Sequence, residues 1–196
     1  MDNWAIILAA GFSTRMGTQK LLLPYGKNTI VETVVDNVLE SNVDHVLMVL
    51  GSDGEKVKEL IGDRPVTYCQ NSMPENGMLS SVLTGMKALP EDANAALIFL
   101  GDQPDISPSV INSVIDAYKG DLYGIVIPVH DHKRGHPLLV DLKYRKDIFK
   151  LDLEMGLRSL MHHFPQDVLE VEVDEEGILV DIDTREDYTN ATKKGK

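Results

Sequence analysis

Short apolar runs alternate with amphipathic stretches along most of the chain, and this alternation constrains the fold more than any other feature. Apolar runs of this length are typical of buried strands, whereas apolar residues at helical spacing are typical of helices. We expect strands over residues 4–10, 45–50, 66–70, 95–100, 125–129, 168–173 and 178–182, and a short apolar run at 138–140. We expect helices over residues 30–39, 54–61, 108–118, 144–150 and 156–164, one that ends at 89, and a last one that begins at 184 and frays from 192.

Strands that alternate with helices call for a mainly parallel sheet covered by helices on both faces. The expected fold class is therefore α/β, with a three-layer, Rossmann-like arrangement. The length of 196 residues suits one sizeable core, and the sequence contains no repeat, low-complexity segment or linker. We therefore expect a single domain over residues 1–196. In sheets of this kind, ligands bind at the carboxyl ends of the strands.

Charge and composition exclude several classes of function. The chain carries 19 Lys and Arg against 31 Asp and Glu, a net charge of −12. This balance argues against binding of nucleic acid or of an anionic membrane, since both require clustered cations, but it allows a nucleotide site with a few local cations. The single cysteine, Cys69, permits no internal disulfide, and its apolar neighbours predict a buried, inert thiol. The chain start lacks a basic leader and no apolar run approaches the ~18 residues of a spanning helix, so we expect a cytoplasmic protein.

The first expected strand ends in a loop of small residues that carries two cations, Arg15 and Lys20. Gly11 and Gly17 allow the backbone to approach an anion closely, so that N–H groups can point at phosphate oxygens. An arginine can contact two oxygens at once, whereas a lysine acts as a mobile point charge. The P-loop and G-x-G-x-x-G spacings are both absent. The loop is therefore a candidate phosphate site of another kind, the alternative being a glycine-rich turn with solvated cations.

Residues 8–20 read L-A-A-G-x-S-x-R-M-G-x-x-K, which resembles the signature of the molybdenum cofactor nucleotidyltransferase family, the MobA-like NTP transferases. The resemblance implies the nucleotidyltransferase version of the Rossmann-like fold and a loop that holds the triphosphate of a nucleotide. It implies catalytic roles for Arg15 and Lys20, which would hold the phosphates and stabilise developing charge. The nucleotide-binding residues implied in this stretch are Leu8, Ala9, Ala10, Gly11, Ser13, Arg15 and Lys20.

Two acidic runs supply candidate metal ligands. Asp102 follows an expected strand in G-D-Q-P, and Asp183 lies in D-I-D-T-R-E-D at residues 181–187. Nucleotidyl transfer needs a divalent cation to offset triphosphate charge, and Mg²⁺ prefers carboxylate, water and phosphate oxygens. Both runs resemble family elements, which implies that Asp102 is a catalytic metal ligand and Asp183 a second one. Alternation along the expected strand puts Asp181 on the same face as Asp183, with a weaker case for binding. The competing role for Asp183 is the N-cap of the last helix, where Thr184 could cap instead.

Asn71 and the run G-M-L-S-S at residues 77–81 follow another expected strand and open a helix. Serines at a helix start are most often caps, but small residues and hydroxyls there can also donate to a ribose or base. The run resembles the base- and ribose-binding loop of the family. The resemblance therefore adds these residues to the nucleotide site: Asn71, Gly77, Met78, Ser80, Ser81 and Asp102.

The basic run R-G-H-P at residues 134–137 is out of character with an acidic chain. It resembles the acceptor-side loop of the cytidylyltransferase and xanthine dehydrogenase maturation branch of the family. The resemblance implies that the acceptor binds to Arg134, Gly135, His136 and Arg158. A solvated turn is the alternative, and the spacing of the nearby histidines fits no common zinc pattern. Around Arg158 the chain departs from the G-D-x-G-A-R of related enzymes and retains only Gly156 and Arg158, which leaves the acceptor open.

The resemblance implies a reaction in which a phosphorylated small-molecule acceptor attacks the α-phosphate of a nucleoside triphosphate and pyrophosphate leaves. No general base is needed if the acceptor is already an anion, so catalysis rests on positioning and charge. The L-A-A-G and R-G-H-P runs favour CTP and molybdopterin as substrates, with a molybdenum enzyme as a further partner. The alternatives are a transferase of the same fold that acts on a sugar phosphate or similar acceptor, and a non-catalytic maturation factor that delivers the cofactor to a molybdenum enzyme.

Overall fold

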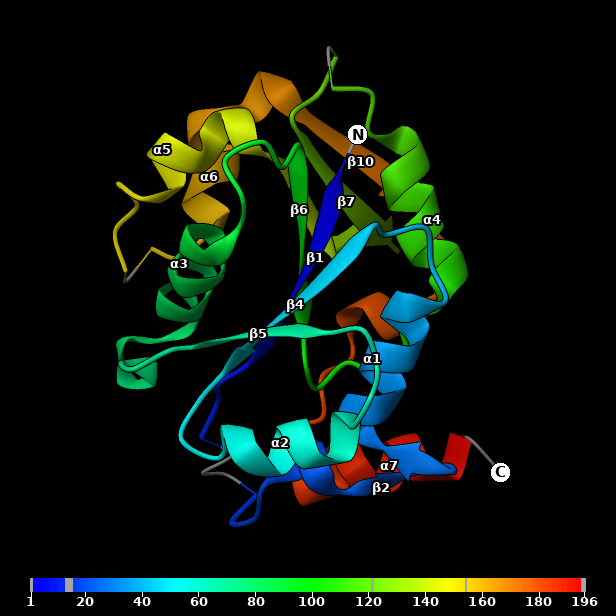
Figure 1. Cartoon of the computed structure of the whole chain (residues 1–196). Helices are drawn as coiled ribbons and strands as arrows, with labels where there is room; N and C mark the ends of the chain where they lie inside the picture. The colour runs from blue at the N-terminus through cyan, green and yellow to red at the C-terminus, as the bar shows by residue number, and fades with distance from the viewer. Residues whose placement is uncertain (1, 13–15, 121, 154, 195–196) are drawn as a thin grey trace.

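A computed structural model of the chain describes residues 2–12, 16–120, 122–153 and 155–194. Its core is a mixed, mostly parallel sheet of eight strands with helices packed against both faces (Figure 1). The α/β class and the three-layer arrangement expected from the sequence are therefore confirmed. The main path of the sheet has the order β10-β7-β9-β6-β1-β4-β5, and β8 pairs with β7 outside this path.

The elements follow one another along the chain much as the apolar pattern predicts. The strands are β1 (Asn3–Ala9), β2 (Pro24–Tyr25), β3 (Asn28–Thr29), β4 (His45–Leu50), β5 (Thr67–Gln70), β6 (Ala95–Leu100), β7 (Ile125–His130), β8 (Lys133–Arg134), β9 (Leu138–Asp141) and β10 (Val168–Glu172). The α-helices are α1 (Ile30–Leu39), α2 (Gly54–Ile61), α3 (Met78–Ala88), α4 (Pro108–Ala117), α5 (Arg145–Ile148), α6 (Arg158–His163) and α7 (Arg185–Lys194). Short 3₁₀ turns include η1 (Lys20–Leu22), η2 (Pro74–Asn76) and η5 (Glu176–Leu179).

Strand β1 lies near the centre of the sheet and pairs in parallel with β4 on one side and β6 on the other. Ile6, for example, lies opposite Leu47 in β4 and Ile98 in β6. Strand β9 runs antiparallel to its neighbours β6 and β7, whereas β10 is parallel to β7 and β5 to β4. The carboxyl ends of β1, β4, β5, β6 and β7 therefore meet at one edge of the sheet, where a doubly wound fold binds its ligands.

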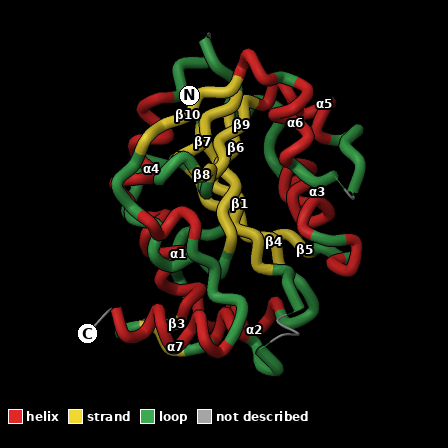
Figure 2. Tube along the Cα trace, turned by 180° about the vertical axis from the view of Figure 1, so that it is seen from behind, coloured by secondary structure: helices red, strands yellow, loops and turns green. Residues whose placement is uncertain are grey.

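Two separate apolar layers hold the helices on the sheet. Helices α1, α2, α4 and α7 pack on one face, and α3, α5 and α6 pack on the other (Figures 1 and 2). Side chains alternate between the faces along β1, so that Ile7 belongs to the first layer and Ile6 and Leu8 to the second. Because both faces are covered, β1 reads in the sequence as a continuous apolar run rather than an alternating one.

The strand expected at residues 178–182 is wrong. These residues form the end of η5 and an irregular segment that leads to Asp183. Two of their four apolar members, Ile178 and Ile182, are buried in the layer of α1 and α4, which explains the misleading pattern. Their backbone groups bind loops instead of a strand: Ile178 O accepts from His136 N, and Ile182 N donates to Asp102 O, each at 3.0 Å.

In the last third of the chain, one expectation agrees with the structure and another does not. β10 is an edge strand, as its alternation of apolar and acidic residues predicts, and it leaves Glu170 and Glu172 exposed. Helix α7 continues to Lys194, so the fraying expected from residue 192 is wrong for residues 192–194.

Cys69 on β5 is half-buried rather than buried, and burial raises the pKa of its thiol, which favours the inert, protonated form.

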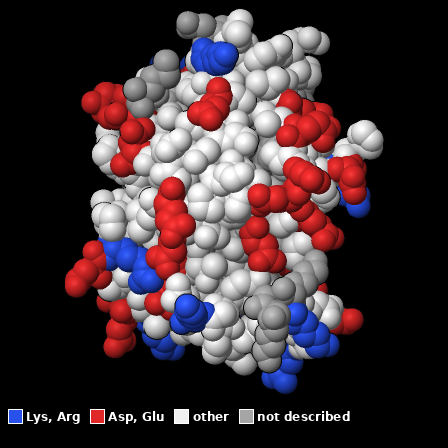
Figure 3. Space-filling model, turned by 90° about the vertical axis from the view of Figure 1, so that its right-hand side faces the viewer, with Lys and Arg blue, Asp and Glu red and all other residues white. Residues whose placement is uncertain are grey.

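Acidic side chains dominate the surface on the side of α1 and α4. Figure 3 shows Asp and Glu spread over the middle of this face and most of its Lys and Arg toward the lower edge. The distribution agrees with the net charge of −12 and offers no broad basic patch on this face. Within the described ranges, none of the helices has the length and apolar character needed to span a bilayer.

Candidate functional site

The ends of β1, β4 and β6 approach one another so closely that glycine is required beside them. A Cβ atom at Gly51 would lie 2.8 Å from Ala10 O, and one at Gly101 would lie 2.9 Å from Leu8 O, both shorter than real contacts. Gly101 N also donates to Leu8 O at 3.0 Å. The loop after β1 and the loop after β6 therefore leave the sheet side by side, as the strand-end argument from the sequence requires.

Three charged residues meet just beyond these strand ends. Lys20 Nζ donates to a carboxylate oxygen of Asp102 and, at 2.6 Å, to Asp183 Oδ1. The side chains are largely withdrawn from water, with exposed fractions of 11% for Lys20, 17% for Asp102 and 23% for Asp183. We call these three residues the phosphate-side cluster. Sequence reasoning selected all three, although Asp102 and Asp183 lie 82 and 163 positions from Lys20 along the chain.

The cluster has an excess of negative charge, since it contains two carboxylates and one ammonium group. Burial lowers the pKa of Lys20, but attraction to and hydrogen bonds with Asp102 and Asp183 outweigh it, so that the pKa lies above its ordinary value. The second carboxylate oxygen of Asp102, Oδ1, is buried and has no hydrogen-bond partner in the part of the chain that the structure describes. A buried carboxylate oxygen without a donor is expected to have another ligand, such as a cation or water.

These residues fit a divalent cation that also binds phosphate. Mg²⁺ retains several water ligands and commonly uses one or two carboxylates together with substrate phosphates. Asp102 and Asp183 supply such a pair, and the unpartnered oxygen of Asp102 supplies a further ligand position. Across the described residues, no group of three or more His, Cys, Asp or Glu side chains gathers into a self-sufficient metal site. A cation held here would therefore depend on the nucleotide for the rest of its coordination.

The start of α7 leaves Asp183 available for this cluster. Thr184 N donates to Asp187 Oδ2 at 2.7 Å, and Asp187 N donates to Thr184 Oγ1 at 3.1 Å, which is a reciprocal cap. The N-cap role considered for Asp183 thus falls to Thr184. The strand expected to place Asp181 on the same face as Asp183 is absent, but the two carboxyl groups still lie close together, since Asp183 supplies both a charge and a hydrogen bond to Asp181. Asp181 remains exposed, and partial desolvation together with the charges of Asp183 and Asp102 raises its pKa.

The other residues of the first loop that are predicted to bind the nucleotide lie at or after the end of β1. Leu8 and Ala9 at the end of β1, and Ala10 directly after it, have buried side chains, so they could contact a nucleotide only through their backbone. Gly11 follows them at the exposed strand end, where a Cβ atom would meet nothing within 4 Å. The predicted residues Ser13 and Arg15 lie outside the described residues.

The second predicted nucleotide loop, residues 71–81, is organised by Asn71. This side chain is buried; its Nδ2 donates to Ser80 Oγ at 2.9 Å and to Ser81 Oγ at 3.0 Å, and its Oδ1 accepts from Met73 N. Gly77 adopts φ +82°, which other residues rarely tolerate, and allows α3 to begin at Met78. Asn71, Ser80 and Ser81 thus shape the loop, and their contact with a nucleotide stays a prediction.

A cavity of about 740 Å³ lies between α3, α6 and the sheet. It contains all four residues predicted to bind the acceptor, Arg134, Gly135, His136 and Arg158, and it is bounded by Met78 of the predicted nucleotide loop. Its walls are mainly apolar: Leu79, Val82, Ile98, Ile127, Leu138, Leu153, Met155, Leu157 and Met161. The volume lies in the range of small-molecule sites. We call this space the α3–α6 cavity.

The basic side chains of the cavity differ in whether they have a hydrogen-bond partner and in whether they carry a charge. Arg134 Nε and Nη2 donate to Glu170 Oε1 at 2.7 and 2.6 Å, so this arginine already has a carboxylate partner. Arg158 is exposed, and no described side chain forms an ion pair or hydrogen bond with it. Burial, with a smaller contribution from the charge of Arg158, lowers the pKa of His136 to about 4, so this imidazole is neutral at neutral pH. Among the residues that the structure describes, the cavity thus offers an unpaired arginine beside a neutral imidazole.

The loop of residues 134–137, which is predicted to bind the acceptor, is joined to the phosphate-side cluster through residues 177–183. A Cβ atom at Gly135 would lie 2.4 Å from Ile178 O, and one at Gly177 would lie 2.3 Å from Asp105 O. Asp105 also accepts a hydrogen bond from the Tyr25 hydroxyl, so its side chain has a partner within the fold. This segment therefore connects the cavity with the loop of Asp102 and ends at Asp183.

Sequence reasoning missed Glu170 and assigned His162 only a structural role, whereas both line the cavity. Glu170 stands among the alternating acidic residues of an edge strand, where solvation is the ordinary explanation. Its pairing with Arg134, 36 positions away, depends on the parallel alignment of β10 with β7. His162 lies on α6 beside His163 with the same exposure, and no pattern separates the two.

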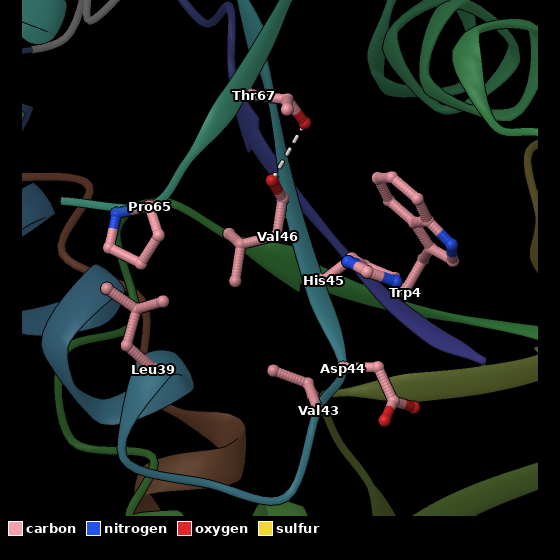
Figure 4. Close-up of a pocket in the computed structure, with 8 residues that line it drawn as sticks. All are labelled: Trp4, Leu39, Val43, Asp44, His45, Val46, Pro65 and Thr67. Atoms are coloured by element: carbon pink, nitrogen blue, oxygen red, sulfur yellow. Dashed lines mark hydrogen bonds between the residues drawn. The ribbon is translucent and has the colours of Figure 1, made fainter. Parts of the chain in front are cut away.

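A second, smaller hollow of about 160 Å³ lies at the opposite ends of β1 and β4 (Figure 4). Trp4 and His45 lie against each other there, with ring centroids 4.5 Å apart. Asp44, which supplies the carboxylate of this hollow, already accepts from Asn3 N through Oδ2 at 2.8 Å. The hollow is too small for a nucleotide and is remote from the carboxyl edge of the sheet.

The fold and the carboxyl-edge cluster define a Rossmann-like α/β protein whose charged loops meet where such folds bind nucleotides. The sequence matches the family model of the MobA-like NTP transferase domain over residues 5–168, so the chain belongs to this family of nucleotidyltransferases.

Similar proteins extend over almost the whole chain. A molybdenum cofactor cytidylyltransferase from Escherichia coli (strain K12) is 27% identical over 190 residues, covering 96% of this chain and 95% of that protein. Nicotine blue oxidoreductase from Paenarthrobacter nicotinovorans is 28% identical over 188 residues, covering 92% of each. The crystal structure of Rv0371c from Mycobacterium tuberculosis H37Rv superimposes with a TM-score of 0.86 at 24% identity, covering 98% of both chains. The structural match supports the fold.

Proposed function

We propose that the chain transfers a nucleoside monophosphate from a nucleoside triphosphate to a phosphorylated small molecule and releases pyrophosphate. The observation that carries this proposal is the phosphate-side cluster, in which Lys20 bonds both Asp102 and Asp183 at the end of the central strands. The α3–α6 cavity supports it further, because Met78 of the predicted nucleotide loop also lines this cavity. An acceptor and a nucleotide can therefore lie side by side.

In the proposed reaction an oxygen of the acceptor phosphate bonds to the α-phosphorus, and the bond from that phosphorus to the bridging oxygen breaks. Pyrophosphate leaves with the electron pair, and no proton has to be removed from an anionic acceptor. Lys20, with Arg15, holds the phosphates and stabilises negative charge as it develops. Asp102 and Asp183 would hold Mg²⁺, which offsets the charge of the triphosphate when bound. Rate enhancement then comes from positioning and electrostatics.

We propose CTP and molybdopterin as the substrates. The L-A-A-G and R-G-H-P runs support this choice, as does the similarity to a protein named as a molybdenum cofactor cytidylyltransferase. The α3–α6 cavity combines apolar walls with Arg134, His136 and Arg158, a lining that suits a planar ring system that carries a phosphate. A molybdenum enzyme as recipient of the product, and a cytoplasmic location, belong to the same proposal.

The acceptor is the part of the proposal with a real competitor. Leu153 and Leu157 replace the small residues expected beside Arg158, and both line the cavity. A relative of nearly the same identity is named as an oxidoreductase, so likeness at this level does not determine the substrate. A transferase that acts on a sugar phosphate or another phosphorylated acceptor is the second candidate. A non-catalytic maturation factor ranks lower, because Lys20 and Asp102 are retained.

Pyrophosphate release tests the proposal directly. Purified protein is supplied with Mg²⁺, molybdopterin and each of the four nucleoside triphosphates, beside Asp102→Ala and the control Asp116→Ala, whose carboxylate is exposed on α4. Release with CTP, lost in Asp102→Ala and retained in Asp116→Ala, is the expected result. Release with GTP would retain the reaction and overturn the nucleotide. Nucleotide binding without release would direct the search to another acceptor or to the maturation factor.

A further inference from the structure

Among the described residues, Lys20 bonds two carboxylates, Asp102 and Asp183, that a phosphate-binding lysine would have to leave. Its ammonium group lies between Asp102 and Asp183, the two carboxylates that fit a divalent cation. One unit of positive charge cannot neutralise these carboxylates and a triphosphate at the same time. Lys20 therefore has two competing sets of anionic partners, one within the protein and one on the nucleotide.

The same contacts make the carboxylate pair a poor metal site while Lys20 remains there. A cation that approached Asp102 and Asp183 would meet an ammonium group already bonded to both, in surroundings where water screens charge weakly. If Lys20 moved away, two adjacent carboxylates would be left without that counterion, an arrangement that strongly favours a divalent cation.

The local backbone lets the side chain move without the loop. Lys20 begins the 3₁₀ turn η1, and the following residue, Leu21, is buried with only 7% of its surface exposed. Leu23 N donates to Lys20 O at 3.0 Å, which closes the turn. The backbone at Lys20 is thereby anchored, whereas its long side chain can change partners by rotation about its own bonds.

We infer that Lys20 is a displaceable counterion that keeps the Asp102–Asp183 pair closed to divalent cations until nucleotide phosphates draw it away. Metal and nucleotide then bind cooperatively, because the nucleotide removes the Lys20 side chain from the carboxylates that bind the metal. The inference rests on the proposed function, since it assigns the order in which that site fills. It adds that the free protein is protected from binding metal without substrate.

Binding of Mn²⁺ to the nucleotide-free protein, followed by electron paramagnetic resonance of the free ion, tests the inference without turnover. Lys20→Met is compared with wild type, and Lys27→Met serves as a control because it removes an equal charge from an exposed position. We expect Lys20→Met to bind Mn²⁺ roughly 5- to 150-fold more tightly than wild type, the usual range of coupling between sites. Lys27→Met should match wild type, and Lys20→Met combined with Asp183→Asn should lose the gain.

Equal Mn²⁺ affinity in wild type and Lys20→Met would overturn the inference, as would an equal gain in Lys27→Met. Lys20→Gln provides a second neutral variant if Lys20→Met fails to fold by circular dichroism. Calorimetric titration of wild type with each of the four nucleoside triphosphates, with and without Mn²⁺, is the arm that addresses the proposed function. If Lys20→Met gains Mn²⁺ affinity but no nucleotide binds to wild type, the counterion role stands and the proposed nucleotide function falls.

Discussion

The two halves of the candidate site are built on different principles. In the phosphate-side cluster, charged side chains are largely buried and bonded to one another, so each has a defined position. In the α3–α6 cavity the walls are apolar, and the charged residues Arg134 and Arg158 are exposed. Substitutions in the first half should therefore abolish any transfer reaction, whereas substitutions in the second should change which acceptor is used.

The difference fits the demands of the proposed chemistry. The triphosphate of every nucleotide carries the same charges, so one fixed set of charged residues can serve any nucleotide. An acceptor has to be distinguished from other phosphorylated molecules by shape and by a few polar contacts. The segment of residues 177–183 joins the halves, because it contacts the acceptor-side loop at one end and carries Asp183 at the other. Three measurements can contradict this division of the site into two halves, and a fourth refines it.

The largest effect is expected from Asp102→Asn. This change retains the size of the side chain but removes one of the two carboxylate charges beside Lys20, so kcat/KM for transfer should fall by about 10²–10³, the typical loss for one electrostatic contact at a reacting centre. Steady-state assays with Asp116→Asn as the matched control measure the effect. A loss below ten-fold would show that the cluster is not the catalytic half.

The next effect is on stability and depends on pH. Because the pKa of His136 is lowered to about 4 in the folded chain, from an ordinary value of 6.5, the unfolded chain binds a proton at this residue more readily. The contribution of the neutral ring to stability is complete above pH 6.5 and is lost as the pH falls toward 4. Chemical denaturation from pH 7.5 to pH 4.5 should show a steeper decline for wild type than for His136→Gln; parallel declines would refute the assignment.

A smaller effect tests the segment that joins the halves. In Gly177→Ala the new methyl group would meet the Asp105 carbonyl at 2.3 Å, so the backbone has to shift, and we expect the free energy of unfolding to fall by about 1–3 kcal/mol. Gly11→Ala, where nothing lies within 4 Å, is the control for stability. Urea denaturation compares the two, and an unchanged midpoint for Gly177→Ala would mean that residues 177–183 are not a tight connection.

Much of the fold and of the first half could be predicted because both depend on local patterns. Short apolar runs identify the strands, and the carboxyl ends of parallel strands share an edge of the sheet. The proximity of Lys20 and Asp102 therefore follows from their places directly after two such strands. The error at residues 178–182 arose because buried isoleucines satisfy a strand pattern equally well, while the partners of the backbone are set by distant loops. The pairing of Glu170 with Arg134 depends on tertiary alignment, which a single sequence does not contain.

The smallest effect sharpens the comparison within the cavity itself. Arg134 and Arg158 are both arginines on its wall, but Arg134 is bonded to Glu170 and Arg158 has no partner among the described residues. A phosphorylated acceptor should therefore depend more on Arg158. We expect Arg158→Met to raise the KM for the acceptor about ten-fold, in line with one charged hydrogen bond, and Arg134→Met only about two- to three-fold, since exposed ion pairs contribute little. Measurement of acceptor KM and nucleotide KM for both variants separates binding of the two substrates. Equal effects of the two variants would mean that Glu170 does not withdraw Arg134 from the acceptor, and a change in nucleotide KM alone would remove Arg158 from the acceptor half.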